Sequence, residues 1–332
     1  MAPHRYLITG ATGFLGGHLA EVCVARGHPV RTIARAGSDT TFLEKLGVTV
    51  ERGDLTDAAV VARVTDNVDV VVHCAAKVGD WGPVDAYRAV NVEGLRCLLD
   101  ACRHKPLQRF VHISTLGVYA ARHHYGTDES EPLPEHHIDG YTQTKVEAER
   151  LALTYHRDFQ VPVVVLRPGF IYGPRDRTVL PRLIDTLRHR MLRYLGRGHR
   201  AMNTIYVGNL VDAVWLAVDK PQAVGNVYNL TDGQFVSKKQ FIESITKALD
   251  LPAPPPVPVP LFLARVLAWT MERQARMRGA PEAPRLTQAR LKFLGLNLDF
   301  SIERAKRELG YQPRIPFEKA MAETMEWYKQ KT

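Results

Sequence analysis

The stretch Thr9-Gly10-Ala11-Thr12-Gly13-Phe14-Leu15-Gly16 follows the apolar run 6–8 and precedes a helix-like segment. In such a place the first glycine lets the chain leave a strand sharply, the second lets the backbone approach a pyrophosphate, and the third lets the helix pack on a sheet. The N-terminus of the helix would direct free N–H groups and the positive end of its dipole at the phosphates. The stretch therefore predicts a phosphate-binding turn, and its candidate ligand-binding residues are Gly10, Thr12, Gly13, Phe14 and Leu15.

Length and composition fit a globular protein. The chain has 332 residues, 45% hydrophobic and 24% charged, enough for one large unit with a subsidiary lobe. No run reaches the ~18 apolar residues that span a bilayer, and the start lacks the apolar core of a signal peptide. The four cysteines show no metal-like spacing, which favours reduced thiols. We expect a cytoplasmic protein; a membrane association is considered below.

The formal net charge is +9, and two arginine-rich segments, 182–200 and 273–290, hold much of the excess. No nucleic-acid-binding module or interleaved aromatic pattern accompanies this charge. The sequence therefore predicts no nucleic-acid partner. It favours a solvated basic face, or attraction to an anionic substrate or lipid surface.

Short β-branched runs alternate with helical patterns along the first half of the chain. Alternation of this kind builds right-handed βαβ crossovers, and runs that are apolar throughout, such as 68–72 and 163–166, are typical of strands covered on both faces. The sequence predicts an α/β fold with a doubly wound parallel Rossmann sheet in a dinucleotide-binding domain of residues 1–168. Predicted strands are 5–10, 29–34, 48–53, 68–75, 109–114 and 162–167, and predicted helices are 14–26, 40–46, 56–65, 85–104 and 140–157.

After residue 168 this rhythm breaks, which predicts a smaller C-terminal α/β substrate lobe over residues 169–332. The predicted elements are strands 203–207 and 226–230, helices 208–219 and 237–249, and closing helices 299–309 and 316–328. Segments such as 203–230 could return to the first domain. An apolar helix, 261–271, follows a proline-rich stretch and suggests a flap over 255–295. This helix fits a lid, a core helix of the lobe, or a peripheral membrane contact.

Tyr141 and Lys145 open the predicted helix 140–157, and their i, i+4 spacing places both side chains on one face. A free tyrosine titrates near pH ~10. A nearby ammonium group and a positively charged nicotinamide ring would lower the pKa of the phenol. Tyr141 could then exchange a proton with a substrate oxygen near neutral pH.

Thr115 follows the predicted strand 109–114, which ends between the glycine turn and Tyr141. A hydroxyl at the carboxyl end of a central strand lies in the ligand crevice, where it could bind the same substrate oxygen. Ser114 would point to the opposite face. The candidate catalytic residues are therefore Thr115, Tyr141 and Lys145.

The whole chain resembles an extended short-chain dehydrogenase/reductase of the NAD-dependent epimerase/dehydratase superfamily. The resemblance rests on the glycine turn, Gly53-Asp54-Leu55, His73-Cys74-Ala75-Ala76, Asn91-Val92-Glu93-Gly94, Ser114-Thr115, the Tyr141/Lys145 pair, and Arg167-Pro168-Gly169-Phe170-Ile171-Tyr172-Gly173-Pro174. It implies a homodimer joined through a four-helix bundle that includes the Tyr141–Lys145 helix. It also implies further cofactor-binding residues: Asp54, Leu55, Ala75, Ala76, Lys77, Asn91, Tyr141, Lys145, Pro168, Gly169, Phe170 and Ile171. Asn91 would support the backbone of the active site.

The end of the second predicted strand bears on the choice of dinucleotide. Enzymes that prefer NAD usually present a carboxylate there to the ribose 2′-OH. This chain has Ala34 at that place and Arg35 next to it, and a guanidinium suits a 2′-phosphate. The sequence favours NADP, with NAD as the alternative if Arg35 stacks on adenine or faces solvent.

The substrate is expected to be hydrophobic. Family members that act on nucleotide sugars usually carry Asn where this chain has Phe170, and Arg-Asp-Phe where it has Met202-Asn203-Thr204, so the polar anchors of a diphosphate are replaced. Arg197 or Arg200 could compensate. The stretch 77–83, with Trp81, is similar to the 2-alkyl-3-oxoalkanoate reductases and the 3β-hydroxysteroid/sterol-carboxylate dehydrogenase branch. The candidate substrate-binding residues are Trp81, Thr115, Tyr141 and Phe170.

These observations predict an NAD(P)-dependent oxidoreductase that moves hydride between a nicotinamide cofactor and a secondary alcohol or ketone. The substrate class would be a 3β-hydroxysteroid or sterol, or a 2-alkyl-3-oxo acid. Two alternatives are an NDP-sugar 4-epimerase or dehydratase and a non-catalytic dinucleotide-sensing protein. No metal is expected: the histidines of residues 121–137 come in adjacent pairs that cannot easily share an ion, and a solvated loop is favoured there.

Overall fold

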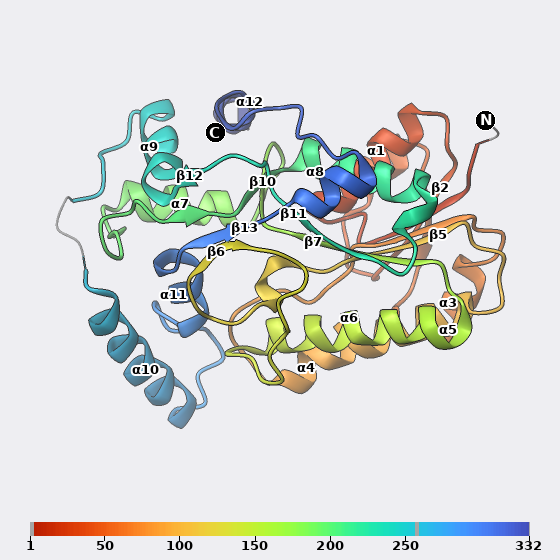
Figure 1. Ribbon diagram of the computed structural model, residues 1–332, viewed down its shortest axis with the longest axis horizontal. Helices are drawn as coiled ribbons and strands as arrows, with labels where there is room; N and C mark the ends of the chain where they lie inside the picture. Colours follow the sequence, from red (N-terminus) through yellow and green to blue (C-terminus); the bar gives the residue numbers. More distant parts are fainter. Residues whose placement is uncertain (1–2, 256–258, 332) are drawn as a thin grey trace.

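The computed structural model describes residues 3–255 and 259–331 of the chain. Its centre is a seven-stranded sheet in the order β11-β7-β5-β4-β1-β2-β3, and every strand pairs parallel with its neighbours (Figure 1). The predicted doubly wound parallel sheet is confirmed. The strands are β1 (Tyr6–Thr9), β2 (Val30–Ala34), β3 (Thr49–Arg52), β4 (Val70–His73), β5 (Arg109–Ile113), β7 (Val163–Pro168) and β11 (Val227–Leu230).

Helices cover both faces of this sheet (Figure 1). Side chains of α1 (Phe14–Ala25) and α8 (Val207–Asp219) pack on one face with Ile8, Val72 and Val111. On the other face, α3 (Ala58–Val64), α5 (Gly94–Cys102) and α6 (Gly140–Phe159) pack with Leu7 and Val71. Side chains alternate along a strand, so each strand supplies both cores. A short helix, α2 (Thr41–Lys45), joins β2 to β3.

The order in which successive strands are added reverses beside β1, which has β2 on one side and β4 on the other. In an open parallel sheet, ligands bind in the crevice outside the carboxyl ends of the strands at such a switch point. The glycine turn follows β1, and Thr115 lies just beyond β5, two strands away. The topology therefore brings both predicted motifs to one edge of the sheet.

The second half of the chain adds smaller elements and one strand, β11, that joins the central sheet beside β7. Three two-stranded sheets pair β8 with β10, β9 with β12, and β6 with β13. The strands are β6 (His124–Thr127), β8 (Phe170–Tyr172), β9 (Ala201–Met202), β10 (Thr204–Tyr206), β12 (Val236–Ser237) and β13 (Leu298–Phe300), and the longer helices are α7 (Val179–Arg188), α9 (Lys238–Ala248), α10 (Leu261–Met277), α11 (Gln288–Gly295) and α12 (Phe317–Lys331).

Two predicted helices have a different form. The segment 299–309 begins as β13, because Leu298 and Phe300 are both buried on one face with exposed Asp299 between them. The helical part begins at Glu303 and continues as the π-turn η4 (Ala305–Leu309). The segment 85–104 is divided into α4 (Val84–Arg88), the π-helical turn η1 (Ala89–Glu93) and α5. π-Turns within helices occur frequently at functional sites.

The predicted solvated loop at 121–137 is wrong in part, because it contains β6. The side chain of His124 is fully buried, and its ring nitrogens bond the Thr127 hydroxyl at 3.0 Å and the Ala120 carbonyl at 3.0 Å. In the described residues, no group of three His, Cys, Asp or Glu side chains is placed to hold a metal ion.

The flap differs from a core helix. Most of the large apolar side chains of α10 face outward, whereas Leu261 packs at its start and the fully buried side chains are Ala264 and Ala268. The core-helix interpretation of 261–271 is therefore wrong. Residues 256–258 of the predicted flap lie outside the described residues. No helix in the described part of the chain is long and apolar enough to cross a bilayer.

Candidate active site

The glycine turn has the shape that a dinucleotide phosphate needs. Gly10 has φ +71°, and a Cβ there would lie 2.8 Å from the backbone nitrogen of Ala75. A Cβ on Gly16 would overlap the carbonyl oxygen of Gly10, so both positions exclude side chains. Gly13 is the N-cap of α1, and no side chain among the described residues caps this helix. Free N–H groups at a helix N-terminus form an anion site.

The other predicted residues of this turn differ in how far their side chains are exposed to solvent. Thr12 and Gly13 are exposed, Phe14 is half-buried against His18, and Leu15 is buried in the core. Leu15 can therefore offer a ligand its backbone but not its side chain. The residues present fit a pyrophosphate bound to the turn by backbone groups.

The ends of β2 and β3 lie side by side next to this turn. The Gly53 N–H donates to the Ala34 carbonyl at 3.0 Å, which sets Arg35 beside Asp54. Both side chains are exposed. Hydrogen bonds from Thr56, with a smaller contribution from Arg35, hold the pKa of Asp54 below its usual range. Leu55 is buried, so Asp54 and Arg35 are the side chains that this edge offers to a ligand.

Asn91 ties the chain after β4 to helix α6. Its side-chain amide accepts from the Lys77 N–H at 2.7 Å and donates to the Lys77 carbonyl at 3.1 Å and to the Thr144 hydroxyl at 3.0 Å. Ala75 N–H donates to the Thr9 hydroxyl at 3.3 Å, and Ala75 and Ala76 are partly buried at the mouth of the crevice. The π-turn η1 carries Asn91. A neutral, buried amide thus shapes the segment 75–77.

Thr115 and Tyr141 come together from β5 and α6. Thr115 begins η2 (Leu116–Val118), where its hydroxyl accepts from the Gly117 N–H at 3.0 Å. Asp139 caps α6 by accepting from the Thr142 N–H at 2.8 Å, which orients the first turn that carries Tyr141. Burial is the main factor that raises the pKa of Tyr141 to about 12; the Asp139 carboxylate also raises it, and a hydrogen bond from Thr115 opposes both.

Lys145 lies one turn further along α6 and is buried, and its ammonium group donates to the Ile113 carbonyl at the end of β5. Burial lowers the pKa of Lys145 to about 8. In this structure Lys145 does not lower the pKa of Tyr141, because burial of the phenol dominates and the lysine is directed at a backbone carbonyl. The lowering by Lys145 together with a bound nicotinamide ring stays a prediction. The three predicted catalytic residues nevertheless lie at one edge of the sheet.

Ser114 belongs to a separate buried network. Its hydroxyl donates to Glu149 at 2.8 Å, and Arg167 forms an ion pair with the same carboxylate. Arg167 also donates to the Tyr119 hydroxyl at 2.7 Å. These groups anchor β5, β7 and α6 to one another behind Thr115. The Ser114 hydroxyl therefore bonds Glu149 in the buried network, whereas the Thr115 hydroxyl contacts Gly117 and Tyr141.

The segment 168–171 lies where β7 ends and β8 begins. Pro168 ends β7 and is buried, and a Cβ on Gly169 would overlap the Asn203 carbonyl oxygen. The Phe170 ring packs between Phe241, at 5.6 Å, and Phe293, at 4.9 Å. Ile171 packs against the main core. Phe170 is thus part of an aromatic cluster that joins β8, α9 and α11.

Trp81 joins the loop after β4 to the flap. The indole N–H donates to the Ala280 carbonyl at 3.0 Å, and Arg276 lies 5.6 Å from the ring centroid. Beside it, Asp80 accepts from the Thr287 hydroxyl at 2.7 Å and pairs with Arg290 at 2.8 Å. Trp81 therefore holds the flap in place.

Sequence reasoning missed Lys292 of α11. Its ammonium group donates to the carbonyls of Gly117 and Tyr119 at 2.6 and 2.7 Å, across the turn that follows Thr115. Burial lowers its pKa to about 8, and Asp139 opposes this change. About 175 residues separate Lys292 from Gly117, so no local pattern could have found this contact.

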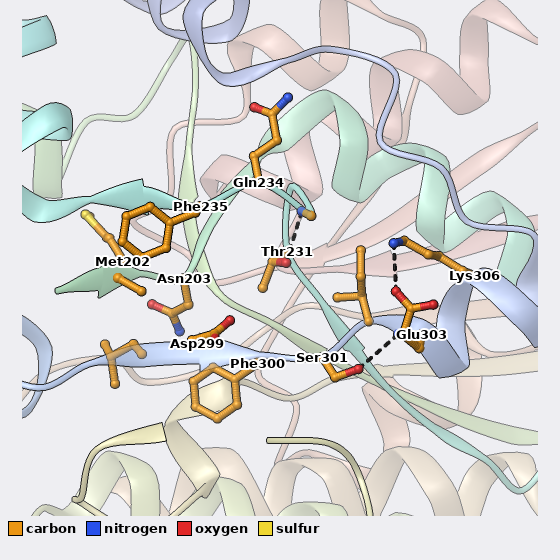
Figure 2. Close-up of a pocket in the computed structure, with 14 residues that line it drawn as sticks. Met202, Asn203, Thr231, Gln234, Phe235, Asp299, Phe300, Ser301, Glu303 and Lys306 are labelled. Carbon is orange, nitrogen blue, oxygen red and sulfur yellow. Dashed lines mark hydrogen bonds and ion pairs between the residues drawn. The ribbon is translucent and has the colours of Figure 1, made fainter. Parts of the chain in front are cut away.

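Figure 2 shows a separate pocket of about 170 Å³ between the segments 201–203 and 231–235 on one side and 298–306 on the other. Its polar side chains bond one another: Lys306 pairs with Glu303 at 2.8 Å, and the Thr231 hydroxyl accepts from the Gly233 N–H at 3.1 Å. Met202 lines it, whereas Thr115, Tyr141 and Lys145 do not. The pocket is therefore distinct from the candidate active site.

Comparisons with known sequences agree with this geometry. Residues 6–231 match the profile described as "NAD dependent epimerase/dehydratase family". A protein of Shewanella oneidensis named 2-alkyl-3-oxoalkanoate reductase is 30% identical over 95% of this chain and 84% of its own length. A protein of Mycobacterium tuberculosis named 3 beta-hydroxysteroid dehydrogenase/Delta 5-->4-isomerase is 32% identical over 98% of this chain and 90% of its own length.

Solved structures share the fold. The crystal structure of gox2253 superposes with a TM-score of 0.82 at 27% identity, covering 99% of this chain and 98% of that one. UDP-glucuronic acid 4-epimerase from Bacillus cereus, solved in complex with UDP-glucuronic acid and NAD, gives a TM-score of 0.76 at 23% identity over 99% and 100% of the two chains.

Proposed function

Because the chain belongs to the NAD-dependent epimerase/dehydratase family of extended short-chain dehydrogenases/reductases, we propose that it transfers hydride between a nicotinamide dinucleotide and a secondary alcohol or ketone on a hydrophobic substrate. The observation that carries this proposal is the meeting of Thr115 and Tyr141 at the carboxyl end of β5. Two hydroxyls at that edge can bind one substrate oxygen and exchange a proton with it.

In the direction of reduction, Tyr141 donates a proton to the substrate oxygen and Thr115 holds that oxygen by a hydrogen bond. The neutral phenol that burial favours is the form this step requires. The nicotinamide ring, when bound, supplies or accepts the hydride, and its oxidised form carries a positive charge that favours the phenolate. Lys145 would hold the nicotinamide ribose, and Asn91 would support the backbone of the active site, as the family resemblance implies.

NADP is the proposed dinucleotide, and Arg35 is the residue that supports it. Ala34 ends β2 without a carboxylate, and the Arg35 side chain is exposed next to it. The Arg35→Ala variant should raise the Kd of NADPH about tenfold, the size of one lost charged hydrogen bond, and leave the Kd of NADH unchanged. Arg314→Ala, an arginine whose side chain is 80% exposed on a distant part of the chain, is the control. Equal weakening for both cofactors would contradict the preference for NADP.

A hydrophobic substrate of the 2-alkyl-3-oxo acid or 3β-hydroxysteroid type is supported by three features. Phe170 contributes an aromatic ring, not an amide, to the segment beside the site. Met202 is buried where nucleotide-sugar enzymes tend to carry an arginine. Arg200, which could have replaced that charge, donates to the Gly295 carbonyl instead. The relatives named above act on oxo acids or steroids, as their names state.

The test is oxidation of NADPH in the presence of a 2-alkyl-3-oxo acid or a 3-ketosteroid, with wild-type protein and Tyr141→Phe. The wild type should turn over one of these substrates, and the variant should lose about 10²–10⁴-fold of kcat with little change in cofactor affinity. Tyr125→Phe, at an exposed tyrosine, is the matched control.

Calorimetry with UDP- and GDP-sugars distinguishes the proposed oxidoreductase from a nucleotide-sugar epimerase or dehydratase. Appreciable binding of a nucleotide sugar, with no NADPH oxidation by either ketone, would favour an epimerase or dehydratase. Tight dinucleotide binding with no turnover of any of these compounds would favour a dinucleotide sensor.

A further inference from the structure

The outer face of α10 is an exposed apolar surface. The exposed fractions are 66% for Phe262, 51% for Leu263, 60% for Val266, 54% for Leu267, 56% for Trp269 and 71% for Met277. Five of these side chains lie within residues 262–269, about two turns of the helix, and Met277 lies about two turns further, beyond exposed Thr270, Arg273 and Gln274. Single exposed apolar residues are ordinary, but a contiguous patch marks an interaction site.

The opposite face of α10 is the one that packs against the protein. Ala264 and Ala268 are 2% and 0% exposed and form a small cluster with Leu195 and Leu291. Small side chains let α10 lie close to α11, while the large ones point away from the molecule. Figure 1 shows α10 at the periphery, beyond α11 and away from the central sheet. The fold itself therefore does not use the apolar side.

Arginines flank this apolar face. The exposed side chains of Arg265, Arg273 and Arg278 have no acidic partner within the described ranges, and Arg276 has only Glu272, at 3.8 Å. The Arg273 guanidinium lies 5.6 Å from the centroid of Trp269. An interfacial helix has this composition: Trp, Phe and Leu on one side, with Arg or Lys beside them.

A second basic segment lies next to the start of α10. Leu195 bridges to Val259 in parallel, with Gly196 N–H donating to the Val259 carbonyl at 3.0 Å. This contact brings the segment 188–197 beside the helix. The exposed side chains of that segment are Arg188, His189, Arg190, Met191, Arg193 and Arg197.

We propose that α10 and the segment 188–197 form one docking surface for an anionic lipid bilayer. Anionic headgroups supply the charge that the arginines lack, and the apolar side chains enter the acyl boundary. A second copy of this chain fits less well, because a two-fold contact would place arginines opposite arginines. The inference rests on surface and charge, and not on the proposed reaction.

The test uses the full purified chain and two kinds of vesicle, phosphatidylcholine alone and phosphatidylcholine with phosphatidylglycerol, separated by flotation. Binding should require phosphatidylglycerol and should weaken as salt rises. Removal of two charges in Arg273→Gln/Arg278→Gln should weaken binding roughly thirtyfold. The control Arg177→Gln/Lys319→Gln removes two exposed charges elsewhere and should have little effect.

The apolar contribution is tested with Val266→Ser/Trp269→Ser, which should weaken binding at least about tenfold. Its control is Tyr125→Ser/Phe235→Ser, two residues of similar exposure on other elements. Absence of wild-type binding to either vesicle would overturn the proposal. Equal weakening of binding by an α10 double variant and by its control would also overturn it. So would an α10 double variant that dissociates an oligomer and leaves vesicle binding unchanged.

Discussion

At Tyr141 and Lys145, burial favours the uncharged form of both side chains. The pKa of the phenol is raised to about 12 and that of the ammonium is lowered to about 8. The i, i+4 spacing is visible in the sequence, but the desolvation of each group depends on the strands and loops packed around α6. Reduction of a ketone begins from the protonated phenol, which the protein alone already stabilises.

Lys292 connects α11 to the turn that follows Thr115. Its two hydrogen bonds hold the turn 116–118 from the side of the flap. The Lys292→Met variant should lower kcat and leave the Kd of the dinucleotide unchanged, because the variant loosens the Thr115 hydroxyl and leaves the glycine turn intact. Steady-state kinetics and fluorescence titration measure the two effects.

The control is Lys319→Met, at an exposed lysine of α12. Lys292→Arg should restore part of kcat, since a guanidinium can also donate to two carbonyls. A Lys292→Met enzyme with wild-type kcat would exclude this positioning role.

At the scale of elements, the glycine turn is the best-defined part of the site. Gly10 and Gly16 serve the packing of β1, α1 and the chain after β4, whereas exposed Gly13 lies where a phosphate would approach. Gly10 and Gly16 are therefore expected to matter for folding and Gly13 for binding, and substitutions can separate these two roles.

Gly13→Ala should fold but bind dinucleotide more weakly. The added Cβ would lie 3.1 Å from the Gly10 carbonyl oxygen, a tight but adjustable contact, at φ −87°. Gly16→Ala, whose Cβ would overlap that oxygen, should lower the melting temperature instead. Gly37→Ala meets nothing within 4 Å and serves as the control. If Gly13→Ala bound NADPH as tightly as the wild type, the phosphate would not approach at this glycine.

The helices α5 and α6 bear on assembly. Leu151 and Cys97 are partly exposed at the margin of the second core. Leu151 lies on α6, the helix that the family resemblance places in a four-helix bundle, and Cys97 lies on α5, which packs beside α6. We expect a dimer, with twice the 37.3 kDa mass of one chain, and a monomer for Leu151→Arg. Light scattering during size-exclusion chromatography measures both; a monomeric wild type would contradict the expectation.

At the scale of the whole molecule, three buried lysines couple stability to pH. Burial lowers the pKa of Lys145 and Lys292 to about 8 and that of Lys238 to about 7, whereas lysines of the unfolded chain titrate near ~10.4. Between about pH 7 and about pH 8.5 the unfolded chain binds more protons than the folded one, so the free energy of unfolding should rise with pH.

Urea unfolding across this interval tests the coupling. Above about pH 8.5 ionisation of cysteines in the unfolded chain works in the opposite direction, because burial raises the pKa of Cys23, Cys74 and Cys102 to about 12. Lys238→Met should reduce the rise, and Lys319→Met should not. A free energy of unfolding that is constant or falls from about pH 7 to about pH 8.5 would contradict this coupling of stability to the lysine pKa values.

The sequence by itself determined the parts of this protein that depend on short-range chemistry. The glycine spacing, the apolar strands and the Tyr141/Lys145 pair each lie within one or two turns of chain, and backbone geometry makes them readable there. The parallel sheet follows from their alternation. The glycine turn and the strand end that carries Thr115 then follow as neighbours at its carboxyl edge.

Only the tertiary structure decided what depends on contacts between distant segments. The chain from 298 forms β13 because Leu298 and Phe300 pair with β6. Lys292 of α11 donates to the carbonyls of Gly117 and Tyr119, far away in the sequence. The large side chains of α10 face outward because Ala264 and Ala268 are the ones that pack against the protein. Burial sets the charge of Tyr141. The desolvation and packing of a side chain depend on all the residues around it in the fold. A pattern of nearby residues in the sequence does not identify those neighbours.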